Sequence, residues 1–257
     1  MCTATWIYSH DSYELFFNRD ELHTRAPAIP PHVQEVKGIR YVAPMDPDGG
    51  GTWIGTNEYG LTAALLNFYP GVDSTQRSPF IGPREGMISR GEIVCSAMAY
   101  RTVDGVASML ESNELARYNP FTLLCISSEG GPVRMQWFDE FLVDKSPKMP
   151  LSSSSFRTGP VIANRISTFA KMQTQVRKQM TTQSQKRMRT DEQAAAHTHY
   201  HRSHTPEKGA FSVCMHREDA QTQSYTHVVV DADRINYTYL PGSPCTTEAL
   251  PEVSINR

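Results

Sequence analysis

The chain has 257 residues, of which 39% are hydrophobic and 20% charged, and its formal net charge is -2 at pH 7. These values are typical of globular proteins and exclude an intrinsically disordered chain. A charge so close to zero creates no field that would attract nucleic acid, so a small molecule is the expected partner. The longest apolar runs are shorter than the roughly 20 residues that a membrane-spanning helix needs, so we expect no membrane span.

The cysteines argue against a disulfide framework and against a zinc site, because their number is odd and no Cys-x-x-Cys pair is present. They lie at five widely spaced positions, Cys2, Cys95, Cys125, Cys214 and Cys245. The start of the chain also lacks the basic residues of a signal peptide. This pattern predicts a cytoplasmic protein without a cofactor, and the sequence is compatible with a homo-oligomer.

Strand signals dominate the first seventy residues. Apolar or β-branched runs separated by polar turns predict hairpins at 2–9, 13–20, 52–56 and 60–68. Residues 26–48 contain five prolines, which a central strand excludes, so a surface loop is expected there. Helical periodicity then predicts two helices, at 88–100 and 103–116.

The second half continues with strands at 121–127 and 133–138, a helix at 162–180, and late strands at 211–216, 226–230 and 234–239. Its polar, histidine-rich segment 181–209 is predicted to be flexible. The order of strands, helices and strands predicts a layered α+β fold, and we interpret residues 1–257 as one domain. Because several strands are apolar on both faces, both sides of the sheets should be covered.

Cys2 is the first candidate for chemistry. A small residue after Met1 permits removal of the initiator methionine, which would leave a thiol and a free α-amine on one residue. The α-amine has a reference pKa of about 7.7–8.0, so near neutral pH part of it is an unprotonated base beside a nucleophile. The alternative is an N-terminal cysteine that packs as a small hydrophobic residue.

Polar residues next to apolar runs provide further candidates. In a strand, Asn18 and Asp20 share one face and Arg19 lies on the other. Asp20 could orient the α-amine, and Arg19 could favour the thiolate or bind a substrate carbonyl; an exposed turn is the alternative. Asn67 places an amide on an otherwise apolar face, either as an oxyanion donor or as a structural amide bonded to a loop.

Several motifs resemble known families when taken together. The Met-Cys start, Asn-Arg-Asp-Glu at 18–21, Gly-Gly-Thr-Trp-Ile-Gly at 50–55 and Gly-Leu-Thr-Ala-Ala-Leu-Leu-Asn at 60–67 resemble the NRDE family, which includes the transport and Golgi organisation 2 homologues. More distantly, Asn-Glu-Tyr-Gly-Leu at 57–61 and Leu-Asn-Phe at 66–68 are similar to segments of choloylglycine hydrolases and penicillin V acylases, which are N-terminal nucleophile hydrolases.

The resemblance implies a four-layer αββα sandwich with Cys2 as nucleophile, Asp20 as its orienting partner and Asn67 as an oxyanion donor. Asn164, which opens the helix predicted in the second half, is the candidate for a second oxyanion asparagine. The chain departs from those hydrolases at Phe17, where they carry an arginine. The residues assigned to substrate binding are Asn18, Arg19, Trp53 and Arg217.

These expectations support a cysteine N-terminal nucleophile hydrolase or acyltransferase that acts on a non-peptide C–N amide bond through a thioester on Cys2. The alternative is a non-catalytic protein that handles haem or a lipid in the same pocket. Removal of Met1 separates the two, because a retained methionine blocks the α-amine. The expected partner is a small acyl-amide substrate.

Four histidines in a short stretch invite a metal-site hypothesis, because alternate positions of an extended run share a face. They are His197, His199, His201 and His204. We favour a histidine-rich solvated loop, or one that lines the mouth of the pocket, and expect no metal.

Overall fold

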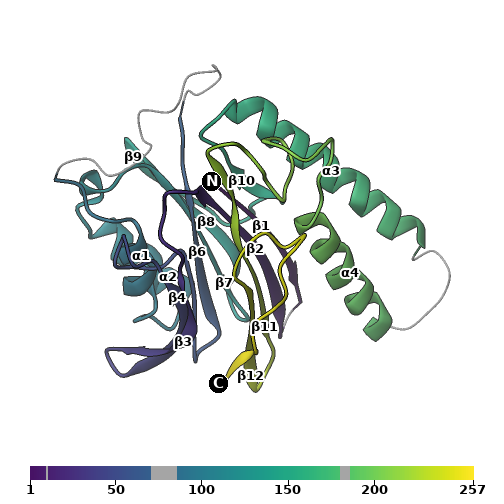
Figure 1. Cartoon of the computed structure of the whole chain (residues 1–257). Coiled ribbons are helices and arrows are strands. Elements are labelled where there is room, and N and C mark those ends of the chain that lie inside the picture. The colour runs from purple at the N-terminus through teal and green to yellow at the C-terminus, as the bar shows by residue number, and fades with distance from the viewer. Residues whose placement is uncertain (10, 71–85, 180–185) are drawn as a thin grey trace.

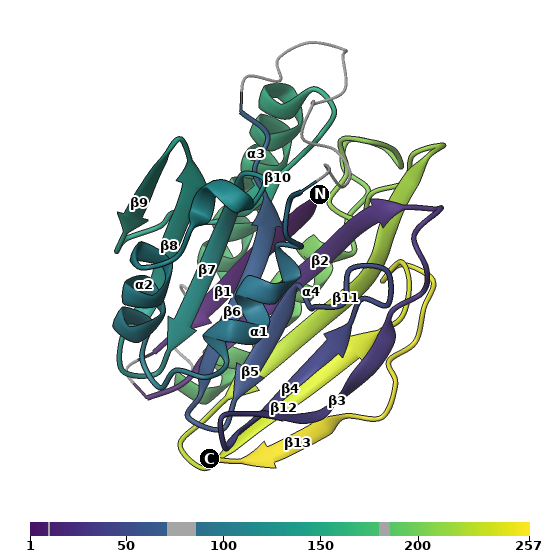
Figure 2. The same ribbon diagram turned by 90° about the vertical axis from the view of Figure 1, so that its left-hand side faces the viewer.

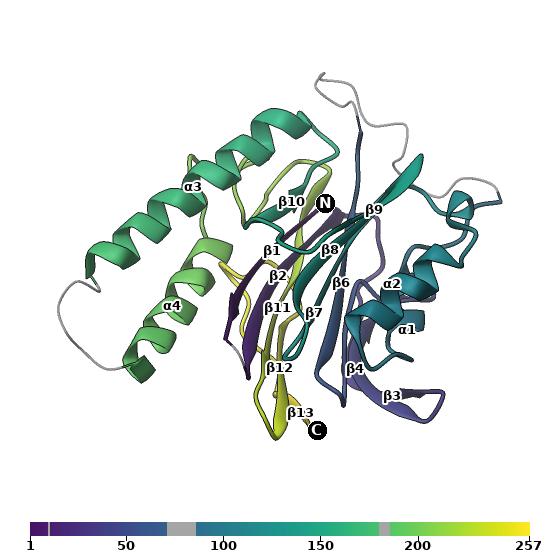
Figure 3. The same ribbon diagram turned by 180° about the vertical axis from the view of Figure 1, so that it is seen from behind.

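The computed structural model describes residues 1–9, 11–70, 86–179 and 186–257, without the side chains of residues 179 and 186–190. Two antiparallel sheets stack face to face, and each carries a pair of helices on its outer face (Figure 1). Figure 2 looks onto the layer formed by helices α1 and α2, and Figure 3 shows the same four layers from behind. The α+β class and the αββα sandwich expected from the sequence are confirmed.

One sheet has six strands in the order β10-β1-β2-β11-β12-β13. Its strands are β1 (Cys2–Tyr8), β2 (Tyr13–Leu22), β10 (Leu151–Ser153), β11 (Ala220–Val230), β12 (Arg234–Leu240) and β13 (Val253–Asn256). The N-terminal strand β1 lies between β10 and β2, so the start of the chain is held within a sheet.

The other sheet has seven strands in sequential order, β3-β4-β5-β6-β7-β8-β9. They are β3 (Ile29–Val36), β4 (Ile39–Met45), β5 (Ile54–Asn57), β6 (Leu61–Asn67), β7 (Phe121–Ser127), β8 (Gly131–Phe138) and β9 (Glu140–Asp144). Strands that follow one another in the sequence are therefore neighbours in this sheet.

Alternation along the strands builds the core between the two sheets. On β1 and β2 the side chains of Trp6, Leu15 and Phe17 face this core, and on β6 Ala64 and Leu66 meet them from the other sheet. Full burial of an apolar side chain of the size of Leu or Phe contributes about 1.5–3 kcal/mol. The inner faces of the sheets therefore hold the sandwich together.

The outer faces are apolar as well and are covered by helices. Helices α1 (Gly91–Ala97) and α2 (Val103–Glu111) pack on residues of β6 and β7 such as Leu65 and Leu123. Helices α3 (Thr158–Gln179) and α4 (Lys186–His201) cover the six-stranded sheet. Within the described residues, no helix has the length and apolar character needed to cross a bilayer.

The prediction of a loop at 26–48 was wrong, because this segment forms β3 and β4. Pro30 and Pro31 are tolerated because β3 is an edge strand with a register shift between Ile29 and His32. Pro44 lies opposite the register shift of β3 and outside residues 41 and 42, through which β4 pairs with β5. The missing N–H groups thus fall where the sheet needs no donor.

The histidine-rich segment also differs from the prediction. Residues 181–185 lie outside the described residues, but residues 186–201 form helix α4 instead of a flexible segment. The reason is tertiary packing, because His197, Tyr200 and His201 bury one face of the helix against the six-stranded sheet and α3. The predicted strand at 211–216 is absent, and the chain there runs irregularly toward β11.

Candidate functional site

Cys2 occupies the first position of β1, at the end of the inner core. Its backbone pairs with Arg19 of β2 on one side and with Ser153 of β10 on the other. The Cys2 N–H donates to the Ser153 Oγ at 3.0 Å. The sheet therefore fixes the position of the thiol and of the nitrogen that becomes the terminal amine if Met1 is removed.

Met1 fills the space in front of this cysteine. It is buried, its terminal ammonium donates to the Asp20 carbonyl at 2.8 Å, and its own carbonyl accepts from the Asp20 N–H at 2.7 Å. The thioether sulfur lies 3.3 Å from the Ser154 Oγ and 3.7 Å from a guanidinium nitrogen of Arg217. A residue at this place thus has both polar and apolar partners.

A cleft of about 520 Å³ opens beside the terminus. It brings together five of the residues that the sequence singled out, Cys2, Arg19, Asp20, Trp53 and Asn67. A larger cavity, of about 670 Å³, lies near Glu58, Arg101 and Arg257, and neither cysteine nor histidine is among the described residues that line it. Of these two cavities, the cleft is the one whose described lining includes a cysteine.

Burial dominates the acidity of the Cys2 thiol. Desolvation raises its pKa to about 11, although the positive charges of the terminal ammonium and of Arg19 act in the opposite direction. Burial also acts to lower the pKa of the Met1 ammonium, but nearby groups, Tyr69 first and Asp20 among them, outweigh it and raise this pKa to about 10. With Met1 in place, the thiol at neutral pH is protonated.

Asp20 forms a buried ion pair that the sequence did not reveal. Its Oδ2 lies 3.3 Å from Arg165 of α3, both side chains are fully buried, and its Oδ1 accepts from the Thr222 hydroxyl at 2.7 Å. Burial raises the pKa of this carboxyl, while Arg165 opposes the rise. Arg165 also donates to the Thr3 Oγ1 at 2.7 Å, so it fastens α3 to the terminal strand.

Arg19 lies on the opposite face of β2 from Asp20, as the alternation predicts. Its guanidinium stands 4.3 Å from the centre of the Trp53 ring and 3.1 Å from Asp46. Arg25 donates to the same Asp46 oxygen at 2.7 Å. These arginines lower the pKa of the Asp46 carboxyl against the effect of burial, so a fixed network of charges lines this wall of the cleft.

Asn67 ends β6 at the rim of the cleft and is half-buried. Its Nδ2 donates to the Tyr69 hydroxyl at 3.0 Å. Tyr69 is buried and packs against Met1, although nothing in the sequence distinguished it from other aromatic residues. The amide is thus placed on the cleft side, with a second polar group beside it.

Two sequence candidates lie outside this cleft. The Asn18 amide is buried and donates to the carbonyls of His201 and Val213, which joins β2 to the helical layer. The Asn164 amide donates to the carbonyls of Thr205 and Phe211. Both side chains make structural contacts, and neither is among the residues that line the cleft.

Arg217 approaches the site from the segment before β11. It lines a small cavity of about 30 Å³ together with Met1, Asp20 and Tyr69. Its Nη2 lies 2.7 Å from Asp219, and its guanidinium stands 5.3 Å from the centre of the Phe156 ring. Arg217, assigned to substrate binding from the sequence, therefore lies next to Met1.

The four histidines of 197–204 do not converge. His197 and His201 both contact the Thr5 hydroxyl, at 2.8 and 2.9 Å, beneath the outer face of β1. His199 is exposed on the other side of α4, and His204 lies beyond the end of the helix. Helical geometry separates side chains that an extended run would have placed on one face.

Solved structures with the same architecture include proteins from different organisms. Penicillin V acylase from Agrobacterium tumefaciens superposes with a TM-score of 0.51 at 14% identity, over 97% of this chain and 84% of that one. A single-residue variant of conjugated bile acid hydrolase from Clostridium perfringens has a TM-score of 0.51 at 12% identity, over 100% and 96%. The Caenorhabditis elegans orthologue of N-acylethanolamine-hydrolyzing acid amidase has a TM-score of 0.51 at 11% identity, over 98% and 100%.

At these identities the similarity establishes the fold and nothing finer. No curated protein matches the chain in sequence. The model of the family "Transport and Golgi organisation 2" matches residues 1–241, which is nearly the whole chain and includes every residue of the cleft. The protein therefore belongs to the transport and Golgi organisation 2 family, with the fold of the N-terminal nucleophile hydrolases.

Proposed function

We propose that the chain, after removal of Met1, is a cysteine N-terminal nucleophile hydrolase or acyltransferase that cleaves a non-peptide C–N amide bond. The observation that carries the proposal is the position of Cys2, held by two strands at the wall of the 520 Å³ cleft and one residue from the free terminus. One structural relative is named as an amidase that hydrolyses N-acylethanolamines, which supports an N-acyl amide as the substrate class.

Removal of Met1 would free the groups that catalysis requires. The Cys2 nitrogen becomes a primary amine, 3.0 Å from the Ser153 Oγ. The Asp20 N–H and carbonyl lose the partners that Met1 supplies. The vacated volume adjoins Tyr69 and Arg217, so an apolar group with a polar end fits the space that methionine leaves.

The reaction follows from these groups. The Cys2 thiol gives its proton to the unprotonated α-amine as the sulfur attacks the substrate carbonyl carbon, and a tetrahedral adduct forms. Asn67 donates its amide N–H to the developing oxyanion. The C–N bond then breaks, and the leaving amine takes the proton from the α-ammonium, which yields a thioester on Cys2. Water or a second amine attacks the thioester and restores the thiol.

Asp20 acts as a positioning residue in this proposal. Its carboxylate is fixed by Arg165 and Thr222, and its negative charge would stabilise the α-ammonium that forms when the amine accepts the thiol proton. Trp53 contributes a buried indole N–H that has no hydrogen-bond partner among the described residues. Leaving such a donor unpaired costs about 1–3 kcal/mol, which a bound ligand that accepts from it would offset.

The second candidate is a protein that holds haem or a lipid in the same pocket without cleaving it. The burial of Met1, with its ammonium and carbonyl both bonded to Asp20, favours this alternative, because a retained methionine is already well accommodated. In that case the cleft binds its ligand beside Met1 and the thiol takes no part.

Amide cleavage by purified, Met1-free protein tests the proposal. We expect release of the amine from N-acylethanolamines or related N-acyl amides, loss of the activity in Cys2→Ala, and retention in Cys95→Ala, a cysteine of α1 outside the cleft. Asn67→Ala should lower kcat by about 100–1000-fold, as does loss of an oxyanion donor elsewhere. Equal rates in the unaltered protein and Cys2→Ala would rule out the thioester route.

A further inference from the structure

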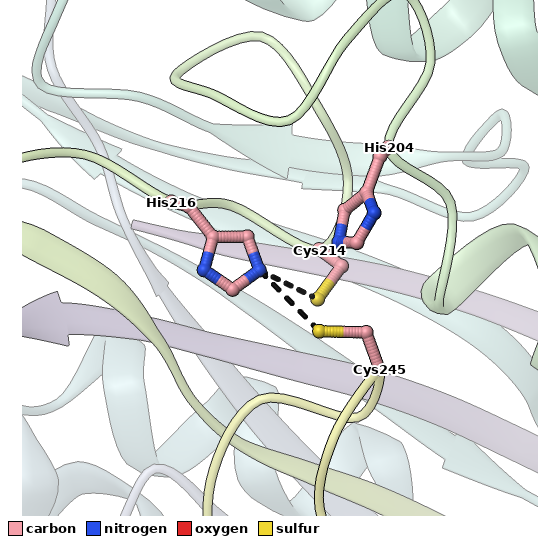
Figure 4. Close-up of side chains that lie close together, drawn as sticks. All are labelled: His204, Cys214, His216 and Cys245. Carbon is pink, nitrogen blue, oxygen red and sulfur yellow. Dashed lines mark hydrogen bonds between the residues drawn. The ribbon is translucent and has the colours of Figure 1, made fainter.

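Four side chains of the types that bind metals converge near the candidate site, and they come from three separate segments of the chain. His204 follows α4, Cys214 and His216 lie in the irregular segment before β11, and Cys245 follows β12. One ligand atom from each lies within 4.8 Å of all the others. Figure 4 shows the two sulfur atoms and the two imidazole rings gathered around a common point.

Two nitrogen–sulfur distances in the cluster fit a tetrahedral metal. The His216 Nε2 lies 3.5 Å from the Cys214 Sγ and 3.5 Å from the Cys245 Sγ. Zinc bonds of about 2.3 Å to sulfur and 2.0–2.1 Å to nitrogen place neighbouring S and N ligands of a tetrahedron roughly 3.6 Å apart. The two nitrogen–sulfur edges therefore match the edges of a zinc site before any ion is added.

The buried imidazole of His204 gives a second, independent indication of a metal site. Its Nε2 is buried and has no hydrogen-bond partner within the part of the chain that the structure describes. Its ring centre lies 5.1 Å from that of His216, with the planes at 68°. A buried imidazole nitrogen without partners costs free energy, and coordination of the cluster to a metal would account for its position.

The backbone around the cluster holds the ligands in place. The Cys214 N–H donates to the Ser203 carbonyl at 3.1 Å, and the Ser212 hydroxyl donates to the Cys214 carbonyl at 2.6 Å. His216 pairs with Gln221 in an isolated bridge, and Cys245 lies within the turn that begins at Ser243. Hydrogen bonds therefore anchor the segments that carry Cys214, His216 and Cys245.

We propose that His204, Cys214, His216 and Cys245 bind one zinc ion as a closed, structural Cys₂His₂ site. Two thiolates and two imidazoles in tetrahedral arrangement are the donor set that selects Zn²⁺. Binding releases the two thiol protons to solvent, so the two negative sulfurs balance the charge of the ion. Four protein ligands leave no open position, which assigns the metal a structural role.

The site would join parts of the chain that frame the cleft. The carbonyl of Ser212, two residues before Cys214, accepts a hydrogen bond at 2.9 Å from Arg165, the partner of Asp20. Arg217 follows His216 directly and contacts Met1. A zinc ion would therefore clamp the segment that carries these contacts to the C-terminal turn at Cys245. The absence of a Cys-x-x-Cys pair, which argued against a zinc site in the sequence, does not exclude this one because its ligands are distant in sequence.

Metal content of the full-length protein tests the proposal without reference to activity. We expect one zinc ion per chain by mass spectrometry of the metal, and, after chelator treatment, titration with Co²⁺ should give the visible bands of tetrahedral cobalt and a thiolate-to-cobalt charge-transfer band. Cys245→Ser and His216→Asn should each abolish these signals. Cys95→Ser and the exposed His199→Asn, both outside the cluster, should retain them.

Two further results would overturn the proposal. One is metal binding of equal stoichiometry in Cys245→Ser and in the unaltered protein, with both folded by circular dichroism. The other is a Cys214–Cys245 disulfide in freshly purified protein, seen as resistance of both thiols to alkylation before reduction. If Cys245→Ser fails to fold, the cobalt spectrum of His204→Asn decides, because a tetrahedral thiolate spectrum unchanged by that substitution contradicts the four-ligand site.

Discussion

Replacement of Arg165 by methionine tests the electrostatics beneath the candidate site. The side chain is fully buried and donates four hydrogen bonds, to Thr3, Ser152, Asp20 and the Ser212 carbonyl. Methionine keeps much of the volume but removes the guanidinium that pairs with the Asp20 carboxylate. Breaking a buried ion pair from one side costs about 3–5 kcal/mol, so we expect the free energy of unfolding to fall by that amount at neutral pH.

The loss of stability caused by Arg165→Met should depend on pH, and the ionisation of Asp20 sets the direction of that dependence. Burial already raises the pKa of Asp20 in the folded protein, and loss of Arg165 raises it further. The folded state then binds a proton more tightly than the unfolded state, whose carboxyl has a pKa of about 3.9. Stability therefore falls as the pH rises through this interval, and the penalty of Arg165→Met should be larger near neutrality than in mild acid.

Urea unfolding of the single and double variants measures these effects. Asp20→Asn in the Arg165→Met background should restore stability relative to Arg165→Met alone, with a coupling free energy of about 0.5–3 kcal/mol. Arg134→Met is the matched control, because its ion pair with Asp144 is more than a third exposed and is worth about 1 kcal/mol or less. A penalty that is independent of pH and not relieved by Asp20→Asn would refute the reasoning.

Three other predictions concern the helical layer, the cleft and the nucleophile. Burial lowers the pKa of His197 to about 4, so the unfolded state binds more protons than the folded state between about pH 4 and 6.5. The free energy of unfolding should therefore fall on acidification through this window. His197→Gln should flatten this pH dependence, whereas the exposed His199→Gln should not. Gly51→Ala should cost about 1–3 kcal/mol in thermal unfolding because its Cβ would lie 2.5 Å from the Gly91 carbonyl carbon; Gly209→Ala, which meets nothing within 4 Å, should cost far less. In protein that retains Met1, iodoacetamide should alkylate Cys2 slowly at neutral pH, because the thiol pKa is about 11, and fast alkylation there would contradict the burial of the thiol.

The sequence predicted the layers of the fold because the pattern of hydrophobic residues depends on local geometry. Apolar runs such as those of β1, β2 and β6 alternate between the inner core and the helical layers, so their strand character was readable. The prolines of β3 misled the prediction because an edge position, which only the assembled sheet defines, makes them acceptable.

Sequence motifs identified part of the candidate site, whereas residues that join it only through tertiary packing could not be predicted. Cys2, Asp20 and Asn67 lie at the terminus or at strand ends, and the resemblance pointed to them. Arg165 was not identified, since one arginine in an amphipathic helix looks solvent-exposed until α3 is placed over Asp20. The ion pair joins residues 145 positions apart, a separation that no local pattern encodes.

The ligands of the proposed zinc site could not be predicted from the sequence for the same reason. His204 belongs to a run of histidines that suggested a local cluster, yet the helix directs His197 and His201 to Thr5 instead. The other ligands come from positions 214, 216 and 245, which only the three-dimensional arrangement of β11, β12 and their flanking segments brings together.

The mass of the N-terminal peptide, taken from protein incubated with an N-acyl amide and then quenched in acid, tests the central claim most directly. The account predicts a peptide that begins at Cys2 and carries the acyl group as a thioester, which hydroxylamine removes. A peptide that still begins with Met1, or one that begins at Cys2 but never acquires the acyl group while the amide is consumed, would contradict it.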